Sequence, residues 1–294
     1  MGKLARAITE DGSAFCLAVD STDIVSEIER IHAPSAVITA ALGRLATAGV
    51  MMGYLLKGER DSLTLRINGG GPAGQLIVVA DYHGNVKAYA QNTIVELPLN
   101  EQGKLDVGGA VGRDGSLSVV RDLGLKEPYI GQTPLVSGEI AEDITNYYAV
   151  SEQVPTVCGL GVLVAPDLSV QAAGGYLLQL LPFADPSCID VIEKNAANAP
   201  PVSAMIEQGL SPLAICNTLL DGLAPQVLEE GNAAYRCDCS RKRVEKMLSS
   251  IQPEELRAMR DEDKGCEVCC HFCGEKYRFS EEELTEMLEK KYPL

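Results

Sequence analysis

Six of the ten cysteines in this 294-residue chain lie within 37 residues, where they form two groups. The first group is the C-x-C pair Cys237 and Cys239. The second is the run Cys266-Glu267-Val268-Cys269-Cys270-His271-Phe272-Cys273-Gly274, which ends in a C-x-x-C-G sequence. Each short pair lets one turn of backbone present two sulfurs to one ion. The spacing therefore predicts a closed tetrahedral zinc site with four thiolate ligands.

The segment that carries these cysteines, residues 236–294, has few large apolar side chains. Domains of about this size are only marginally stable on their own core. Bound zinc contributes on the order of 10 to 16 kcal/mol of folding free energy in small modules, so we expect the metal to decide whether this tail folds. Zinc-bound thiolates remain oxidisable, which makes a redox switch an alternative. On spacing alone, a constitutive structural zinc module is the favoured interpretation.

Other residues that could do chemistry give weaker signals. Residues 69–74 match G-x-G-x-x-G, but a strand-like apolar segment follows where a dinucleotide site needs a helix, so a turn between strands is expected. His32 and His83 fall at the expected ends of elements, and His271 lies where it could replace a sulfur ligand. The other cysteines are each isolated among apolar neighbours, which favours small core residues. They are Cys16, Cys158, Cys188 and Cys216.

The formal charge of −16 is concentrated ahead of the tail. Residues 236–294 carry 12 Lys+Arg and 14 Asp+Glu, so the other 235 residues carry 13 and 27, a net charge of −14. A nucleic-acid binder needs a basic face to replace the counterions on phosphate, so no nucleic-acid partner is expected. A hydrophobic content of 46% is typical of a globular protein with a core.

The one long apolar stretch, residues 35–56, holds Arg44 near its middle. An arginine there would cost about 2.5 to 3.5 kcal/mol at the centre of a bilayer, so we predict a buried helix and no membrane partner. Residues 1–10 lack the apolar core of a secretion signal. A cytoplasmic location is therefore expected, where thiols stay reduced and clustered cysteines indicate metal or redox chemistry.

Hydrophobic patterns predict an α+β body over residues 1–183, with helices packed on a mostly antiparallel sheet. A helical linker layer is expected over 184–235, because its three short helices would be marginal without docking on the body. A small zinc-binding domain is expected over 236–294, where Ser240 is predicted to cap a helix, Tyr277-Arg278-Phe279 to form a short strand, and Ser280 with Glu283 to form the capping box of a final helix. In the body, strands are predicted in a hairpin over 3–20 and at 63–67, 75–80, 86–90, 117–122, 134–136, 157–164 and 169–180, and helices at 23–32, 35–57 and 139–149.

The two cysteine groups resemble the zinc switch of the heat-shock protein 33 family of redox-regulated holdase chaperones. The resemblance rests on Cys237-Asp238-Cys239-Ser240-Arg241 and Cys270-His271-Phe272-Cys273-Gly274, with thirty residues between Cys239 and Cys270. It extends along essentially the whole chain. The body segments that carry it are Asp81-Tyr82-His83-Gly84, Ser151-Glu152-Gln153-Val154-Pro155-Thr156 and Gly174-Gly175-Tyr176-Leu177-Leu178-Gln179-Leu180-Leu181-Pro182.

The resemblance implies an ATP-independent stress-response chaperone, not an enzyme, that is inactive while reduced and holds one zinc per chain. The implied ligands are Cys237, Cys239, Cys270 and Cys273. It also implies that oxidation joins Cys237 with Cys239 and Cys270 with Cys273, releases zinc, unfolds the tail and loosens the linker. The exposed apolar surface would then hold unfolding or oxidatively damaged client proteins, and homodimerisation would favour the active state.

One feature departs from the family pattern, which needs a single C-x-x-C, because Cys266 and Cys269 form a second one. Gly274 supplies the tight turn of a knuckle, so the later pair is assigned as the ligands. Cys266 and Cys269 could still compete during oxidation. An alternative function is a thiol-disulfide oxidoreductase, although no thioredoxin-like βαβ pattern surrounds Cys270. A zinc-stabilised nucleic-acid adaptor is a third interpretation, which the charge of −16 disfavours.

Overall fold

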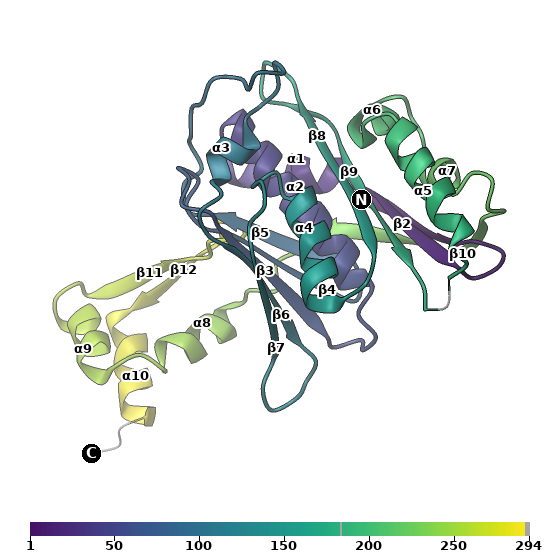
Figure 1. Ribbon diagram of the computed structural model, residues 1–294. Coiled ribbons are helices and arrows are strands. Elements are labelled where there is room, and N and C mark those ends of the chain that lie inside the picture. Colours follow the sequence, from purple (N-terminus) through teal and green to yellow (C-terminus); the bar gives the residue numbers. More distant parts are fainter. Residues whose placement is uncertain (183, 292–294) are drawn as a thin grey trace. The chain divides into compact units, whose positions relative to one another are not determined.

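The computed structural model describes residues 1–182 and 184–291 (Figure 1). It divides into two compact units, Met1–Arg236 and Cys237–Leu294. The first unit contains a large sheet with helices packed on it, and the second contains three helices and a two-stranded hairpin. The predicted α+β fold class is therefore confirmed.

The sheet of the first unit has ten strands in the order β7-β6-β3-β4-β5-β10-β1-β2-β9-β8. Neighbouring strands are antiparallel except β10 and β5, which pair in parallel at two positions. The strands are β1 (Gly2–Ile8), β2 (Ala14–Asp20), β3 (Ser62–Asn68), β4 (Leu76–Asp81), β5 (Asn85–Ala90), β6 (Ser116–Asp122), β7 (Tyr129–Pro134), β8 (Thr156–Val164), β9 (Val170–Leu180) and β10 (Gln226–Tyr235).

One face of this sheet is covered by α1 (Thr22–His32), α2 (Ala36–Tyr54) and α4 (Ala141–Tyr147), with the short α3 (Val107–Val111) beside α2. In the described part of the chain, α2 is the one helix long and apolar enough to span a membrane by length and composition. However, 89% of its most apolar window is buried inside the unit. The prediction of a buried core helix is therefore confirmed.

The opposite face, at β1, β2 and β9, is covered by α5 (Ser187–Asn198), α6 (Val202–Glu207) and α7 (Pro212–Leu219). Successive side chains of β2 alternate between the two faces of the sheet. Because helices cover both faces here, nearly the whole strand is buried. Leu17 packs in the core beneath α2, whereas Cys16 packs in the core beneath α7. The three short helices thus lie on an apolar face of the sheet. This agrees with the prediction that helices of this length need to dock on the body to be stable.

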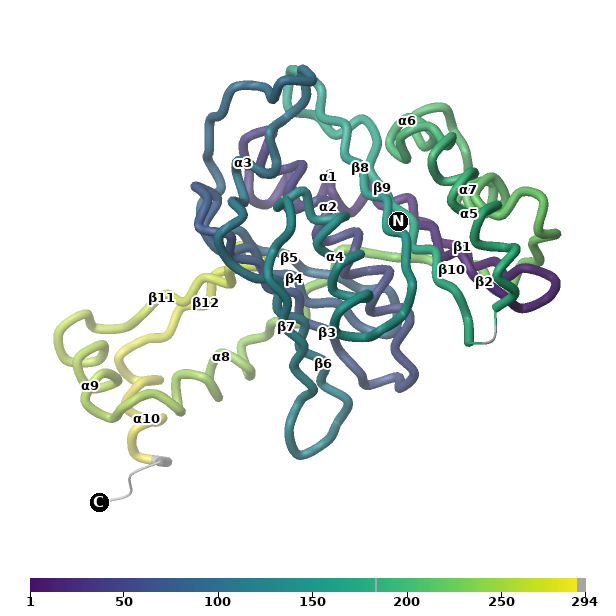
Figure 2. The backbone as a smooth tube through the Cα atoms, viewed as in Figure 1, coloured from purple at the N-terminus to yellow at the C-terminus, as the bar shows by residue number. Residues whose placement is uncertain are grey.

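The linker prediction is wrong at its end, because residues 226–235 form strand β10 and not a helical layer. β10 pairs with β1 along seven positions and lies in the interior of the sheet, between β1 and β5. Its sequence, with Glu229, Glu230 and Gly231, lacks a strand pattern, so pairing with a strand over 200 residues earlier decides its conformation. The layer that can leave without breaking the sheet is therefore α5–α7, which follows β9 and precedes β10 in the chain (Figure 2).

Two smaller differences concern β7 and α3. The strand expected near 134–136 lies earlier, at Tyr129–Pro134, and α3 was not predicted. Three of the five residues of α3 are valine or alanine and two are glycine, a composition that favours no helix by itself. Its N-cap Asp106, which accepts a hydrogen bond from Gly109 N, fixes it locally.

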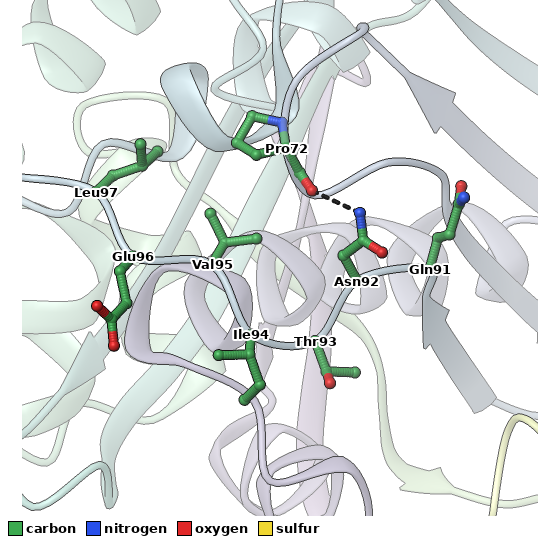
Figure 3. A pocket seen from close by; sticks show the side chains of 8 residues that line it. All are labelled: Pro72, Gln91, Asn92, Thr93, Ile94, Val95, Glu96 and Leu97. Atoms are coloured by element: carbon green, nitrogen blue, oxygen red, sulfur yellow. Dashed lines mark hydrogen bonds between the residues drawn. The ribbon is translucent and has the colours of Figure 1, made fainter.

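The glycine-rich residues 69–74 form the predicted turn between β3 and β4. Most of their backbone N–H groups are occupied; for example, Gly71 N donates to Val111 O at 3.0 Å and Ala73 N donates to Ala110 O at 2.9 Å. The Asn92 side chain also donates to Pro72 O at 2.8 Å, which ties this turn to the segment after β5 (Figure 3). Phosphate binding needs free N–H groups, so this turn is structural.

The second unit contains α8 (Arg241–Leu248), α9 (Pro253–Asp261), β11 (Gly265–Cys269), β12 (Lys276–Ser280) and α10 (Glu281–Lys291). The predicted helix starts are confirmed: Ser240 Oγ accepts from Arg243 N, and Ser280 and Glu283 form a reciprocal capping box. Strand β11 was not predicted. The core of this unit has only six buried apolar side chains among the described residues, namely Val244, Leu248, Leu256, Phe279, Leu284 and Leu288.

The docking of α5–α7 can be weakened at Ile215, which is fully buried between α7 and the sheet. We expect Ile215→Ala to reduce the free energy that holds these helices on the sheet by about 2 to 5 kcal/mol, because it leaves a cavity. Hydrogen exchange should then accelerate in α5–α7 and not in α2. Thr218→Ala, at an exposed position of α7, is the matched control. Equal acceleration in α2 would show that the layer does not open independently.

Candidate metal centre

Four thiols converge in the second unit. The Sγ atoms of Cys237, Cys239, Cys270 and Cys273 all lie within 4.8 Å of one another, and each side chain is half-buried. Cys237 Sγ is 3.7 Å from Cys270 Sγ, and Cys239 Sγ is 3.3 Å from Cys273 Sγ. A tetrahedron with zinc–sulfur bonds of about 2.3 Å has edges of about 3.8 Å. The four cysteines could therefore hold one metal ion, and four soft thiolates suit zinc.

The C-x-x-C pair lies in the turn between β11 and β12. Cys270 N donates to Glu275 O and Gly274 N donates to Cys270 O, both at 2.8 Å. Gly274 has a φ of +73° with nothing within 4 Å of the position that a Cβ would take. Its backbone conformation, and not lack of space, requires glycine there. The turn directs the sulfurs of Cys270 and Cys273 towards the centre of the four-cysteine cluster.

The C-x-C pair lies in the extended segment between β10 and α8. The residue between the two cysteines, Asp238, forms an ion pair with Arg243 on the first turn of α8. Arg241 reaches across to β12, where it donates to Arg278 O at 2.9 Å and lies 4.3 Å from the centre of the Phe279 ring. These contacts fix the start of α8 against β12, so the first cysteine pair is held beside the second.

A tyrosine from β12 contacts the cluster directly. Tyr277 Oη donates a hydrogen bond to Cys239 Sγ at 3.2 Å. This bond raises the pKa of the Tyr277 hydroxyl, because the sulfur accepts its proton. Groups that hydrogen-bond to a ligand orient it and tune its affinity for metal. Sequence reasoning placed Tyr277 on a strand behind the knuckle but gave it no role at the site.

The thiols differ in acidity. Burial, together with hydrogen bonds from neighbouring sulfurs, raises the pKa of Cys237 and Cys273. Burial also acts to raise the pKa of Cys270, but hydrogen bonds from the backbone N–H groups of Phe272 and Cys273 lower it overall. Thiolates bind metal and thiols do not, so metal binding to this cluster must release protons.

The second C-x-x-C pair is separated from the cluster by strand geometry. Cys266 and Cys269 lie three residues apart on β11, which places them on opposite faces of the strand. Cys266 packs against the small core of this unit and pairs with Phe279 across the hairpin. Cys269 is exposed, with its thiol 3.6 Å from Gly274 O. Neither cysteine belongs to the group that could hold a metal.

The three histidines do not belong to the group of residues that could hold a metal. His32 ends α1 and His83 lies in the turn between β4 and β5, as predicted. Among the described residues, the group that could hold a metal contains cysteines and not His271.

The prediction that the body cysteines are core residues is confirmed for Cys16, Cys188 and Cys216, whereas Cys158 is half-buried. The Cys216 thiol donates to Ala5 O at 3.5 Å and to Cys16 O at 3.4 Å. Burial raises the pKa of Cys158 to about 12 and that of Cys16 as well. The thiols of Cys158 and Cys16 are therefore protonated and unreactive in this state.

Known proteins resemble this chain along almost its whole length. A family model described as Hsp33 protein matches residues 2–280. A 33 kDa chaperonin of Clostridium botulinum (strain Alaska E43 / Type E3) is 44% identical over 287 residues, which cover 98% of this chain and 97% of the relative. A 33 kDa chaperonin of Bacillus cytotoxicus is 45% identical over 286 residues, which cover 97% and 98%. The crystal structure of a 33 kDa chaperonin (heat shock protein 33 homolog) from Thermotoga maritima matches with a TM-score of 0.91 and 38% identity over 98% of each chain.

The choice of ligands can be tested with four single variants. We expect Cys270→Ser and Cys273→Ser to abolish tight zinc binding, because each removes one of the four clustered sulfurs. Cys266→Ser and Cys269→Ser should keep one zinc per chain and serve as matched controls from the same hairpin. The measurement is zinc stoichiometry of the reduced protein. Loss of zinc from Cys266→Ser or Cys269→Ser, with the fold intact, would contradict the assignment.

The hydrogen bond from Tyr277 gives a second prediction. Tyr277→Phe removes the hydroxyl that contacts Cys239 and keeps the ring, so zinc affinity should fall by about tenfold or more. Competition with a chromophoric chelator measures this affinity. Tyr129→Phe, at an exposed position of the first unit, is the control. An unchanged affinity would show that the hydroxyl does not influence the cluster.

Proposed function

The chain belongs to the Hsp33 family, and we propose that it is a redox-regulated, ATP-independent holdase chaperone of the cytoplasm. Its relatives are named for a chaperone and not for an enzyme, which supports the binding of client proteins. The observation that carries the proposed regulation is the convergence of four thiols in a unit with a small core. Client binding, in this proposal, is controlled by the oxidation state of those thiols.

In the reduced state, one zinc ion per chain is held by Cys237, Cys239, Cys270 and Cys273. The ion joins the segment before α8 to the turn of the β11–β12 hairpin. Zinc contributes on the order of 10 to 16 kcal/mol to the folding of small modules, which exceeds what six buried apolar side chains supply after chain entropy is subtracted. The second unit is therefore folded while its thiolates stay reduced.

Oxidation joins Cys237 with Cys239 and Cys270 with Cys273. In each reaction two zinc-bound thiolates lose two electrons as the sulfur–sulfur bond forms, and hydrogen peroxide takes up these two electrons and two protons from the solvent to give two molecules of water. Pairing of neighbours follows from the family resemblance. It needs only short movements, because all four sulfurs already lie within 4.8 Å of one another. The two disulfides remove all four ligand thiolates, so the unit loses the metal and unfolds.

Unfolding of this unit then loosens α5–α7. The connections between these parts are short. One residue separates Cys237 from the end of β10 at Tyr235, and only residues 220–225 separate β10 from α7. Departure of the helices would uncover the apolar face formed by β1, β2 and β9, including Cys16 and Leu178. Large exposed apolar patches bind other proteins. This face is the proposed client surface, and homodimerisation in the oxidised state would stabilise it.

The alternative function, a thiol-disulfide oxidoreductase, lacks support from the fold around the cysteines. Cys270 lies in an antiparallel hairpin, whereas thioredoxin-like enzymes carry their C-x-x-C within a βαβ unit.

A single oxidation time course tests the proposed function. We expect peroxide to release one zinc per chain, and suppression of the aggregation of a heat-unfolded client should rise in parallel. The reduced protein should not suppress aggregation, because its apolar face is covered by α5–α7. Cys269→Ser, which keeps all four clustered sulfurs, is the control and should behave like the native chain. Equal suppression in both redox states would refute the switch, and catalytic turnover in a disulfide-reduction assay would favour the oxidoreductase.

A further inference from the structure

Strand β8 forms one edge of the ten-stranded sheet and carries no charged side chain. Soluble proteins usually protect such an edge with charges, proline, a bulge or a covering element, because its unpaired backbone groups can bind another chain. Here protection is limited to the two ends. Cys158 N donates to Thr145 Oγ1 of α4 at 3.3 Å, and the pairing with β9 becomes irregular between Leu163 and Val164.

The register of β8 shows which backbone groups face outward. Leu180 N of β9 donates to Pro155 O at 3.1 Å, and the same register continues along the strand. In an antiparallel pair every second residue bonds its neighbour, so the odd-numbered residues bond β9. The N–H and C=O groups of Leu160 and Val162 therefore point away from the sheet. Within the described residues, no other backbone or side-chain group forms a hydrogen bond with them.

A groove with a volume of about 870 Å³ runs along this open edge. Its floor is β8 from Gly159 onward, one wall is α2 with residues 103–105, and the other wall is residues 199–204 at the start of α6. Figure 1 shows β8 running between α2 and α6. The groove thus has a strand edge between two walls.

At the opposite edge of the sheet, the end of β7 and one of its faces are covered. The Asn146 side chain of α4 donates to Pro134 O at 3.4 Å, and a Cβ at Gly131 would come within 3.0 Å of Tyr147 and Ser151. The segment after α4 therefore packs closely on β7. The groove at β8, by contrast, has walls on both sides of an open strand edge.

We propose that extended segments of unfolded polypeptide bind in this groove by pairing with β8 as an additional strand. The inference deepens the proposed holdase function and rests on it. Pairing through the backbone is available to any unfolded chain, and an uncharged floor accepts apolar side chains at alternate positions. A volume of about 870 Å³ suits a short peptide segment better than the edge of a second folded copy.

The groove also connects this mode of binding to the switch. At Gly161, a Cβ would lie 2.9 Å from Ser203 N, so α6 packs closely on this side of β8. Departure of α6 would widen the groove and join it to the apolar face of β9. A bound segment could then bury one set of alternate side chains on that face and the other against α2. Binding should therefore be tighter in the oxidised chain.

Direct binding of a short peptide of alternating valine and threonine to the oxidised full-length chain tests the inference. Val162→Pro removes an outward N–H and breaks no bond to β9, whereas Val162→Ala loses similar packing and keeps the N–H. We expect about tenfold weaker binding to Val162→Pro than to Val162→Ala. A copy of the peptide methylated at alternate backbone nitrogens should also bind about tenfold more weakly. Equal binding by the two variants, or by the two peptides, would overturn the inference.

A second variant decides the question if Val162→Pro does not fold. Leu163 lines the groove and is 37% exposed, so Leu163→Lys places a charge at the edge at little cost to the core. Peptide binding should be lost in Leu163→Lys and retained in Leu163→Gln, and undiminished binding to Leu163→Lys would refute the groove. If oxidised native protein suppresses client aggregation and both groove variants do so equally, the inference fails while the holdase function stands. A variant that alters only self-association would identify the groove as a dimer contact and also overturn the inference.

Discussion

The structure of the second unit depends on the convergence of four sulfur atoms. Six buried apolar side chains are too few to hold some sixty residues against chain entropy, so a metal cross-link between Cys237–Cys239 and Cys270–Cys273 would have a large share in its stability. A thiolate cluster supplies such a cross-link only while it is reduced and metal-bound. In the proposed function, the same small core that would make the unit dependent on metal would also suit it to sense oxidation.

The position of β10 determines how far a change in the second unit can spread. This strand lies inside the sheet, bonded along seven positions to β1 and at only two to β5. It is also the direct continuation of the segment that carries Cys237. The weak pairing with β5 and the short connection to α7 make this region more easily disturbed than the core beneath α2. Activation by loosening α5–α7 would leave that core intact.

The sheet is buried on both faces at β2 and β9, yet it keeps an uncharged open edge at β8. Such an edge is a liability in an ordinary soluble protein, because it can recruit other strands. In a chaperone the same property is useful, since an unfolded client offers the complementary backbone groups. The apolar face beneath α5–α7 and the edge of β8 are adjacent, so release of one helical layer would affect both.

The sequence by itself determined the features that depend on local spacing: the helix caps at Ser240 and Ser280, the turn at residues 69–74, the buried helix α2 and the two short cysteine pairs. The family resemblance implied that those cysteines form a redox switch. The tertiary structure decided what depends on contacts between distant residues. Residues 226–235 form a central strand because β1 pairs with them. Cys266 and Cys269 lie on opposite faces of β11 because this segment pairs with β12 as a strand. Local patterns record the preferences of a segment, whereas strand pairing and side-chain orientation arise only when segments far apart in the chain meet.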